Sequence, residues 1–183
     1  MLPGTFRMKF FSDFRLLILS LWLGAAVFFI GVAQTAFSVL PQRELAGAVV
    51  NGNLTILNFS GMAIATILLL SSLIGTSTAN KFWLWFERFL LLLLGAACAV
   101  GQFVIGLWLS SVRTQMGRPI DEVAADDPLK IQFNTLHEWS VWVLFAGIVA
   151  ALLVFFIISN RKFGAGKTAA TSDVYDFSKE FKV

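Results

Sequence analysis

Four long stretches without an acidic or basic side chain constrain this chain more than any other feature of its sequence. They cover residues 16–40, 54–79, 89–112 and 139–160. Each is long enough for an α-helix to cross the roughly 30 Å hydrocarbon core of a bilayer, which takes about 20 residues. Only a helix closes all its backbone hydrogen bonds within such a segment, and the period-two alternation of a β-barrel is absent. The sequence therefore predicts an all-α, integral membrane four-helix bundle.

The composition agrees with a membrane protein, and the charges divide the chain into three parts. Apolar residues make up 57% of the 183 residues and charged residues only 14%, whereas soluble domains are about 45–50% apolar. We expect an interfacial amino-terminal segment over residues 1–15, a transmembrane domain over 16–160 and a solvated tail over 161–183. The net charge of +3 is too small and too interrupted for a nucleic-acid surface, so we expect no nucleic-acid partner.

Lysine and arginine are unequally divided between the two sides of the predicted bundle. Ten of the fourteen lie in the amino-terminal segment, the second loop and the tail. The other four are Arg43, Arg113, Arg118 and Lys130, in the first and third loops. Because positively charged loops stay inside, this distribution predicts that both termini are cytoplasmic.

The first and third loops carry signals of helices that begin before the membrane. Asp127 followed by Pro128 is typical of an N-cap and a first helical residue, which predicts a fourth helix from Pro128 to about Asn160. A rough helical spacing of apolar residues also follows Pro41, although Gly52 weakens that prediction.

Small and polar residues share one face of the predicted helices. At 100° per residue, the first helix has such a face within an arc of about 80°. Its members are Ser20, Gly24, Gly31, Gln34 and Ser38. A comparable stripe in the fourth helix consists of His137, Ser140, Val141, Leu144 and Ile148. Small residues let helices approach closely and polar side chains bond across helices, so we expect these faces to meet in the bundle centre.

Several polar residues should lie at a similar depth, because they come from helices of alternating direction and all fall in the outer half. We expect Gln34, Asn58, Gln102, His137 and Ser140 to form one outer-leaflet polar cluster. Two interpretations are open. Hydrogen bonds among these groups fix the helix register, or the cluster is a small outward-facing ligand site.

His137 is the only histidine and Cys98 the only cysteine. We expect a hydrogen-bonding role for His137, because haem takes recognisable axial pairs and zinc takes three or four ligands. Ligation of chlorophyll or haem by His137 is an open alternative; no other cofactor and no metal site is predicted. Cys98 alone cannot form an internal disulfide. The sequence also lacks a serine elbow, a P-loop and a carboxylate pair within a span, so we expect no enzymatic activity.

Two sequence blocks support a family resemblance. Residues 21–24 (LWLG) with 37–50 (FSVLPQRELAGAVV), and residues 133–140 (FNTLHEWS), resemble the bacterial branch of the transmembrane protein 205-like domain family. The resemblance covers roughly residues 16–156 and implies a compact four-helix domain in the bacterial cytoplasmic (inner) membrane. That family has no agreed activity, and its vertebrate member is linked to platinum-drug resistance. This chain departs from the family at Asn58 and Phe59, where bacterial relatives tend to have a histidine, so we expect no histidine-pair metal site here.

Three functions are carried forward from the sequence. The leading one is a non-catalytic accessory or scaffold subunit of a larger membrane complex, such as a pigment- or quinone-containing photosynthetic or electron-transfer complex. It is motivated by the missing catalytic residues and by nineteen phenylalanines, more than so small an interior holds. Its partners would be membrane lipids and other membrane subunits. The alternatives are a small-solute, metal or drug transporter and a single-histidine pigment or haem protein.

Overall fold

The computed structural model describes residues 4–74 and 81–160, and within these two ranges the chain forms helices and no strand. In chain order they are α1 (Gly4–Val39), α2 (Arg43–Ile74), α3 (Lys81–Ala99), the π-helix η1 (Val100–Ile105), α4 (Gly106–Met116), the 3₁₀ turn η2 (Ile120–Glu122) and α5 (Pro128–Ser159). Because α3, η1 and α4 follow one another without a break, the described residues form four long helical segments, which we call rods.

Four segments are long and apolar enough to cross a membrane. They are Phe10–Val39, Arg43–Leu73, Lys81–Met116 and Pro128–Ser159. The predicted all-α membrane bundle is therefore confirmed, and the chain is a multi-pass membrane protein. Each helical segment begins before the uncharged stretch from which it was predicted. Its first turns therefore contain charged residues. Residues 75–79 of the second predicted span and the predicted tail, residues 161–183, lie outside the described residues.

The predicted start of the last helix is confirmed at atomic detail. The Asp127 carboxylate accepts a hydrogen bond of 2.8 Å from the Leu129 backbone N–H, and Pro128 is the first helical residue, where its missing N–H costs nothing. At the other outer connection, α2 starts at Arg43, two residues after Pro41, and continues through Gly52. The first outer loop is therefore only a tight turn.

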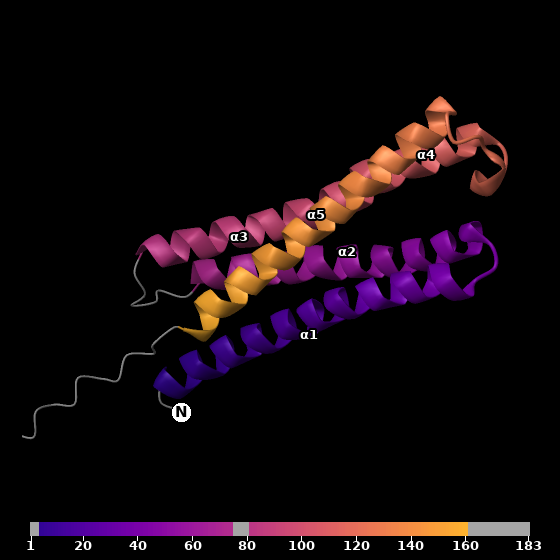
Figure 1. Ribbon diagram of the computed structural model, residues 1–183. Helices are drawn as coiled ribbons and strands as arrows, with labels where there is room; N and C mark the ends of the chain where they lie inside the picture. The colour runs from indigo at the N-terminus through magenta and orange to yellow at the C-terminus, as the bar shows by residue number, and fades with distance from the viewer. Residues whose placement is uncertain (1–3, 75–80, 161–183) are drawn as a thin grey trace, which may run out of the picture.

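The rods pack as an elongated bundle in which α1 and α2 form one hairpin (Figure 1). α2 packs on α3, α3 packs on α5, and α5 also contacts α1 and α4. The main core is formed by apolar side chains such as Leu19, Leu68, Leu91, Leu94 and Val154, all nearly inaccessible to solvent. A second, smaller cluster of Val112, Met116, Val123 and Leu136 holds α4, the loop after it and the start of α5 together.

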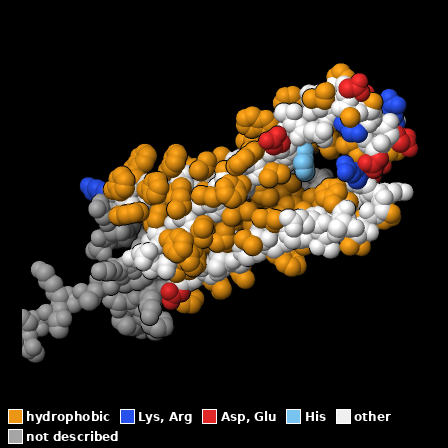
Figure 2. All heavy atoms as spheres, in the orientation of Figure 1, with side chains coloured by type: hydrophobic (Ala, Val, Ile, Leu, Met, Phe, Trp, Pro, Cys, Tyr) orange, Lys and Arg blue, Asp and Glu red, His pale blue; other side chains and the backbone are white. Residues whose placement is uncertain are grey.

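The surface of the bundle separates into an apolar flank and a charged end. Figure 2 shows hydrophobic side chains along the flank and acidic and basic side chains gathered at the end formed by α4, η2 and the start of α5. Large apolar side chains are widely exposed, among them Phe28 and Trp85 at 74% each. Such a surface is unfavourable in water and suits a bilayer.

Candidate functional site

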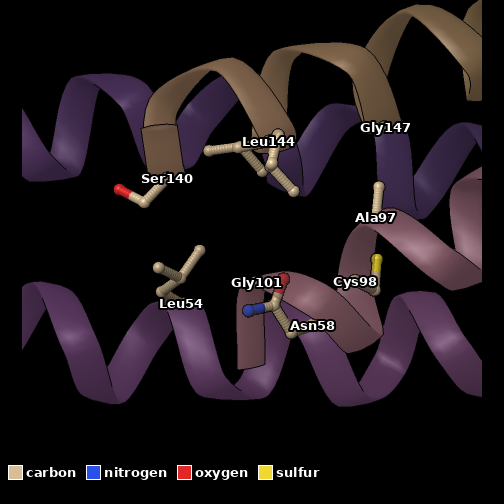
Figure 3. Close-up of a pocket in the computed structure, with 9 residues that line it drawn as sticks. Leu54, Asn58, Ala97, Cys98, Gly101, Ser140, Leu144 and Gly147 are labelled. Carbon is tan, nitrogen blue, oxygen red and sulfur yellow. The ribbon is translucent and has the colours of Figure 1, made fainter. Parts of the chain in front are cut away.

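A small cavity lies between α2, α3, η1 and α5, in the half of the bundle that the sequence predicts to be the outer one. Its volume is about 20 Å³, roughly the room of one water molecule. Figure 3 shows Leu54 and Asn58 on one side of this space and Ser140 and Leu144 on the other. The remaining lining residues are Ala97, Cys98, Gly101, Val143 and Gly147. The cavity is mostly apolar, with an amide, a hydroxyl and a thiol at its wall.

Asn58 supplies the buried polar group of this cavity. Its side chain belongs to a residue only 4% exposed, and its Nδ2 donates a hydrogen bond of 3.4 Å to Gln102 Oε1. Gly101 lies against the same amide, since a Cβ there would be in ordinary van der Waals contact with Asn58 Nδ2 at 3.5 Å. Gln102 sits in the π-helical turn η1, where the Gly106 N–H donates to the Gly101 carbonyl five residues back. Such wide turns are frequent at functional sites.

The structure brings together three of the five residues of the predicted outer polar cluster. Asn58 bonds to Gln102, and Ser140 lines the same cavity as Asn58. Ser140 Oγ also donates to the His137 carbonyl oxygen at 2.6 Å, a bond within its own helix. The side chains of Gln34 and His137 are exposed and do not line the cavity. The five residues therefore do not form one cluster, because Gln34 and His137 lie apart from the cavity. Ligand binding, including pigment or haem at His137, stays a prediction.

Below the cavity, α1, α2 and α3 approach one another closely around Gly61. A Cβ at Gly61 would lie 2.5 Å from Cys98 Sγ and 2.9 Å from Trp22 Nε1. Trp22 Nε1 is held in place because it donates 3.0 Å to the Leu57 carbonyl. Only glycine fits here without displacing a neighbour, and Cys98 is buried against it.

The half of the bundle that is predicted to be the inner one contains a buried ion pair that was not predicted from the sequence. Arg15 Nη2 donates to Glu87 Oε1 at 2.6 Å and to the Leu68 carbonyl at 3.2 Å, so it connects α1, α3 and α2. The two side chains are 9% and 0% exposed. Arg15 Nε is buried without a hydrogen-bond partner among the described residues. Removing either partner would leave an uncompensated buried charge, which is strongly destabilising.

The same end of the bundle has a second polar link between α2 and α3. Arg88 donates from Nη2 to the Ser72 carbonyl at 2.7 Å and from Nε to Ser72 Oγ at 3.2 Å. A signal for this polar inner layer was present in the sequence. Glu87 is the one acid in the segment from Lys81 to Arg88, which is otherwise aromatic, apolar or basic, so a basic partner was to be expected at the same depth.

The outer end is linked by ion pairs of a different character. Arg113 Nη2 lies 3.1 Å from Glu44 Oε1, and Arg43 Nε lies 3.4 Å from Asp121 Oδ1. The four side chains are 37% to 70% exposed. Solvent screens such pairs, so they orient the loop after α4 without contributing much stability.

The small polar face of α1 points away from the bundle centre, which corrects the prediction made from the helical wheel. Its residues are all exposed, namely Ser20, Gly24, Gly31, Gln34 and Ser38. No atom lies within 4 Å of a Cβ built at Gly24 or Gly31. The physical reason is area: the opposite face offers Leu19, Trp22 and Phe29, which bury far more surface against α2 and α5.

The fourth-helix stripe is also only partly correct. Val141 is 53% exposed, whereas the residues of α5 that are buried in the bundle include Gly147, Ala150, Ala151 and Val154. The small residues of α5 therefore do face the centre, but they lie further along the helix, toward its carboxyl end, than the predicted stripe.

Comparison with known proteins places the chain in a family defined by sequence. A domain of unknown function, DUF4149, matches residues 17–118, more than half of the chain. The chain belongs to this family. The DUF4149 match runs from α1 to the end of α4 and includes Asn58, Gln102 and Glu87, while Arg15 and α5 lie outside it. No curated protein and no solved structure gives a significant match. The resemblance to the transmembrane protein 205-like family stays a prediction.

The described residues contain no group of three or more histidine, cysteine, aspartate or glutamate side chains that could hold a metal ion. The chemistry available in the described part of the bundle is thus hydrogen bonding at the cavity, charge pairing at the inner end and close helix packing on the exposed face of α1.

Proposed function

We propose that this protein is a non-catalytic accessory or scaffold subunit of a larger membrane protein complex, with both termini in the cytoplasm of a bacterium. The exposed small polar face of α1 carries the proposal. Ser20, Gly24, Gly31, Gln34 and Ser38, with Val27 between them, follow one another at spacings of four and three residues.

Alternating spacings of three and four residues are the pattern of a seam along which two helices pack at about 20°. In a membrane, glycine and serine at such a seam let two backbones approach closely, and a glutamine gains a hydrogen-bond partner across it. The face has no role in the chain's own core, since the buried side of α1 is the opposite one. A transmembrane helix of another subunit is the occupant that fits it.

The experiment that tests this proposal is extraction in a mild detergent followed by a native gel and mass spectrometry of co-migrating proteins. Wild type is expected in a band larger than the single chain, with fixed partners. Gly24→Leu and Gly31→Leu should release the chain from that band, because a bulky side chain blocks close approach. Gly52→Leu is the matched control, since Gly52 is also exposed, helical and without an atom within 4 Å.

Two outcomes would count against the accessory-subunit proposal. If the wild-type protein migrates on the native gel as a single chain without partners, the accessory-subunit proposal is refuted. A band that Gly24→Leu, Gly31→Leu and Gly52→Leu leave equally intact would show that this face of α1 is not the contact.

A transporter of small solutes is a second candidate, favoured by the cavity at Asn58, Ser140 and the π-helical turn. Its size suits water or a solute of similar size. Stopped-flow light scattering of proteoliposomes would measure water permeability. This candidate predicts a flux above that of protein-free vesicles that Asn58→Leu and Gln102→Leu reduce, and flux equal to protein-free vesicles would refute it.

A further inference from the structure

The inner end of α3 carries an apolar groove that none of the preceding sites uses. It has a volume of about 500 Å³ and is lined by Lys81, Phe82, Trp85, Phe86 and Phe89. Phe82, Trp85 and Phe89 are 68%, 74% and 56% exposed. Phe82 and Phe86 stack with ring centroids 6.3 Å apart and planes inclined by 7°, which gives the groove a flat aromatic wall.

The lining residues are ordered along the axis of α3. Lys81, Trp85 and Phe89 follow at intervals of four residues on one stripe, and Lys81 is the first residue of α3. At ~1.5 Å per residue, Phe89 lies about 12 Å further along the helix than Lys81. A cation therefore stands at the end of the helix, an indole lies one turn along it, and phenyl rings continue toward the uncharged stretch, residues 89–112. Lysine and tryptophan at this level are typical of contacts with lipid headgroups.

Among the described residues in the first turns of α3, the exposed charge is positive. The charged residues in the first turns of α3 are Lys81, Glu87 and Arg88. Glu87 is fully buried and its carboxylate binds Arg15, while Arg88 binds Ser72. Lys81 is exposed and so sets the charge that a ligand in the groove meets. The basic side of the bundle is the one expected to face the cytoplasmic leaflet, where anionic lipids are enriched.

We infer that this groove is a binding site for one anionic phospholipid, with its phosphate at Lys81, its glycerol region at Trp85 and an acyl chain against Phe86 and Phe89. The inference rests on charge complementarity combined with the graded chemistry of the groove, and it is independent of the accessory-subunit proposal. A site of this kind selects lipids by headgroup, whereas lipids elsewhere on the flank exchange without such selection.

Native mass spectrometry of the full chain tests the inference. The purified protein is equilibrated with equal amounts of phosphatidylglycerol and phosphatidylcholine that have the same acyl chains, and the retained lipids are counted. Wild type is expected to retain phosphatidylglycerol in preference by about five-fold, the factor that one lysine beside an anionic surface supplies. Lys81→Gln and Lys81→Glu should abolish the preference, and Lys81→Arg should keep it.

Trp85→Ala and Trp83→Ala form a matched pair that separates a site from general lipid contact. Both tryptophans are exposed, at 74% and 51%, and lie two residues apart on α3, but only Trp85 lines the groove. Trp85→Ala should weaken retention of phosphatidylglycerol several-fold, and Trp83→Ala should leave it unchanged. Thermal unfolding of each variant in detergent verifies that the fold persists.

Three results would overturn the inference. They are equal retention of the two lipids by wild type, equal loss in Trp83→Ala and Trp85→Ala, and a co-purifying protein helix that contacts Trp85 and prevents lipid binding. The last would identify the groove as a protein interface instead.

Discussion

The two faces of α1 differ in almost every physical property, although they belong to the same helix at the same depth. The inward face buries Arg15, Leu19 and Trp22 against the other helices, with less than a tenth of each residue exposed. The outward face has Gly24, Gly31 and exposed polar side chains, and among the described residues no atom of another helix lies within 4 Å of a Cβ built at either glycine. The inward face packs within the bundle, and the outward face is exposed and available for contact with another molecule.

This difference shows that polarity alone does not locate the centre of a membrane bundle. Without a hydrophobic driving force in lipid, the inward face is chosen by packing area and by obligatory polar contacts. Trp22 satisfies both, because its ring fills space and its Nε1 donates to the Leu57 carbonyl. Substitutions on the inward face should therefore change stability, and substitutions on the outward face should change assembly.

The largest effect is expected from Glu87→Gln, which leaves the buried Arg15 guanidinium without its negative partner. Breaking one side of a buried pair costs about 3–5 kcal/mol, so the free energy of unfolding of the detergent-solubilised chain should fall by that order. Tryptophan fluorescence during denaturant titration measures it. Asp13→Asn is the matched control, since Asp13 is an exposed acid on α1. An equal, small effect in both variants would contradict the inward role of Arg15.

Glycine-to-alanine substitutions should change the free energy of unfolding in opposite directions inside the bundle and on the outward face of α1. Gly61→Ala pushes a methyl group against Cys98 and Trp22 and should destabilise by about 1–3 kcal/mol. Gly24→Ala meets open space and should stabilise the isolated chain by about 0.5–1 kcal/mol, because alanine favours the helix. Thermal unfolding of the two purified variants measures both shifts. Destabilisation of the isolated chain by Gly24→Ala would contradict the assignment of Gly24 to an exposed face of α1.

Glutamine-to-leucine substitutions provide a smaller contrast. Gln102→Leu removes the acceptor of Asn58 Nδ2 and should cost about 1 kcal/mol. Gln34→Leu replaces an exposed polar group with an apolar one and should leave the isolated chain unchanged while weakening any complex it forms. Unfolding titrations and native gels of the same preparations record the two effects. A loss of stability in Gln34→Leu equal to that in Gln102→Leu would place Gln34 in the core.

The smallest effect is expected at the outer ion pairs. Glu44→Gln removes the partner of Arg113, and because both side chains are more than a third exposed, the loss should stay below about 1 kcal/mol. Raising the ionic strength from 0.1 M to 1 M shortens the Debye length from about 10 to 3 Å and should erase this difference between wild type and variant. A large, salt-independent loss would mean that the outer pair resembles the Arg15–Glu87 pair.

Much of the architecture could be predicted from the sequence, because four uncharged runs allow only spanning helices and Asp127 with Pro128 determines where α5 begins. The rotation of α1 could not be predicted from one helical wheel. Its small polar face and its Leu19–Trp22 face both look plausible as the centre until the partner helices are present. Helix rotation depends on contacts such as Gly61 with Trp22, which join residues distant in sequence.

The candidate site was predictable in part for a similar reason. Position along a helix follows from residue number, and the structure does bring Asn58 together with Gln102 and with Ser140. Direction around the axis depends on packing, and Gln34 and His137 point elsewhere. The Arg15–Glu87 pair was missed because both residues lie just outside the uncharged runs. A charged residue in that position is expected at the membrane boundary rather than in the interior of the bundle.

A crosslinking scan along α1 in native membranes tests the central claim most directly. A photoreactive amino acid is placed in turn at positions 20, 24, 27, 31, 34 and 38, and at the inward positions 19, 22, 26 and 29. The outward face is predicted to crosslink to one defined membrane protein at spacings of three and four residues, while inward positions crosslink only within the chain. Crosslinks from the outward positions to lipid alone, or to no fixed partner, would contradict the account.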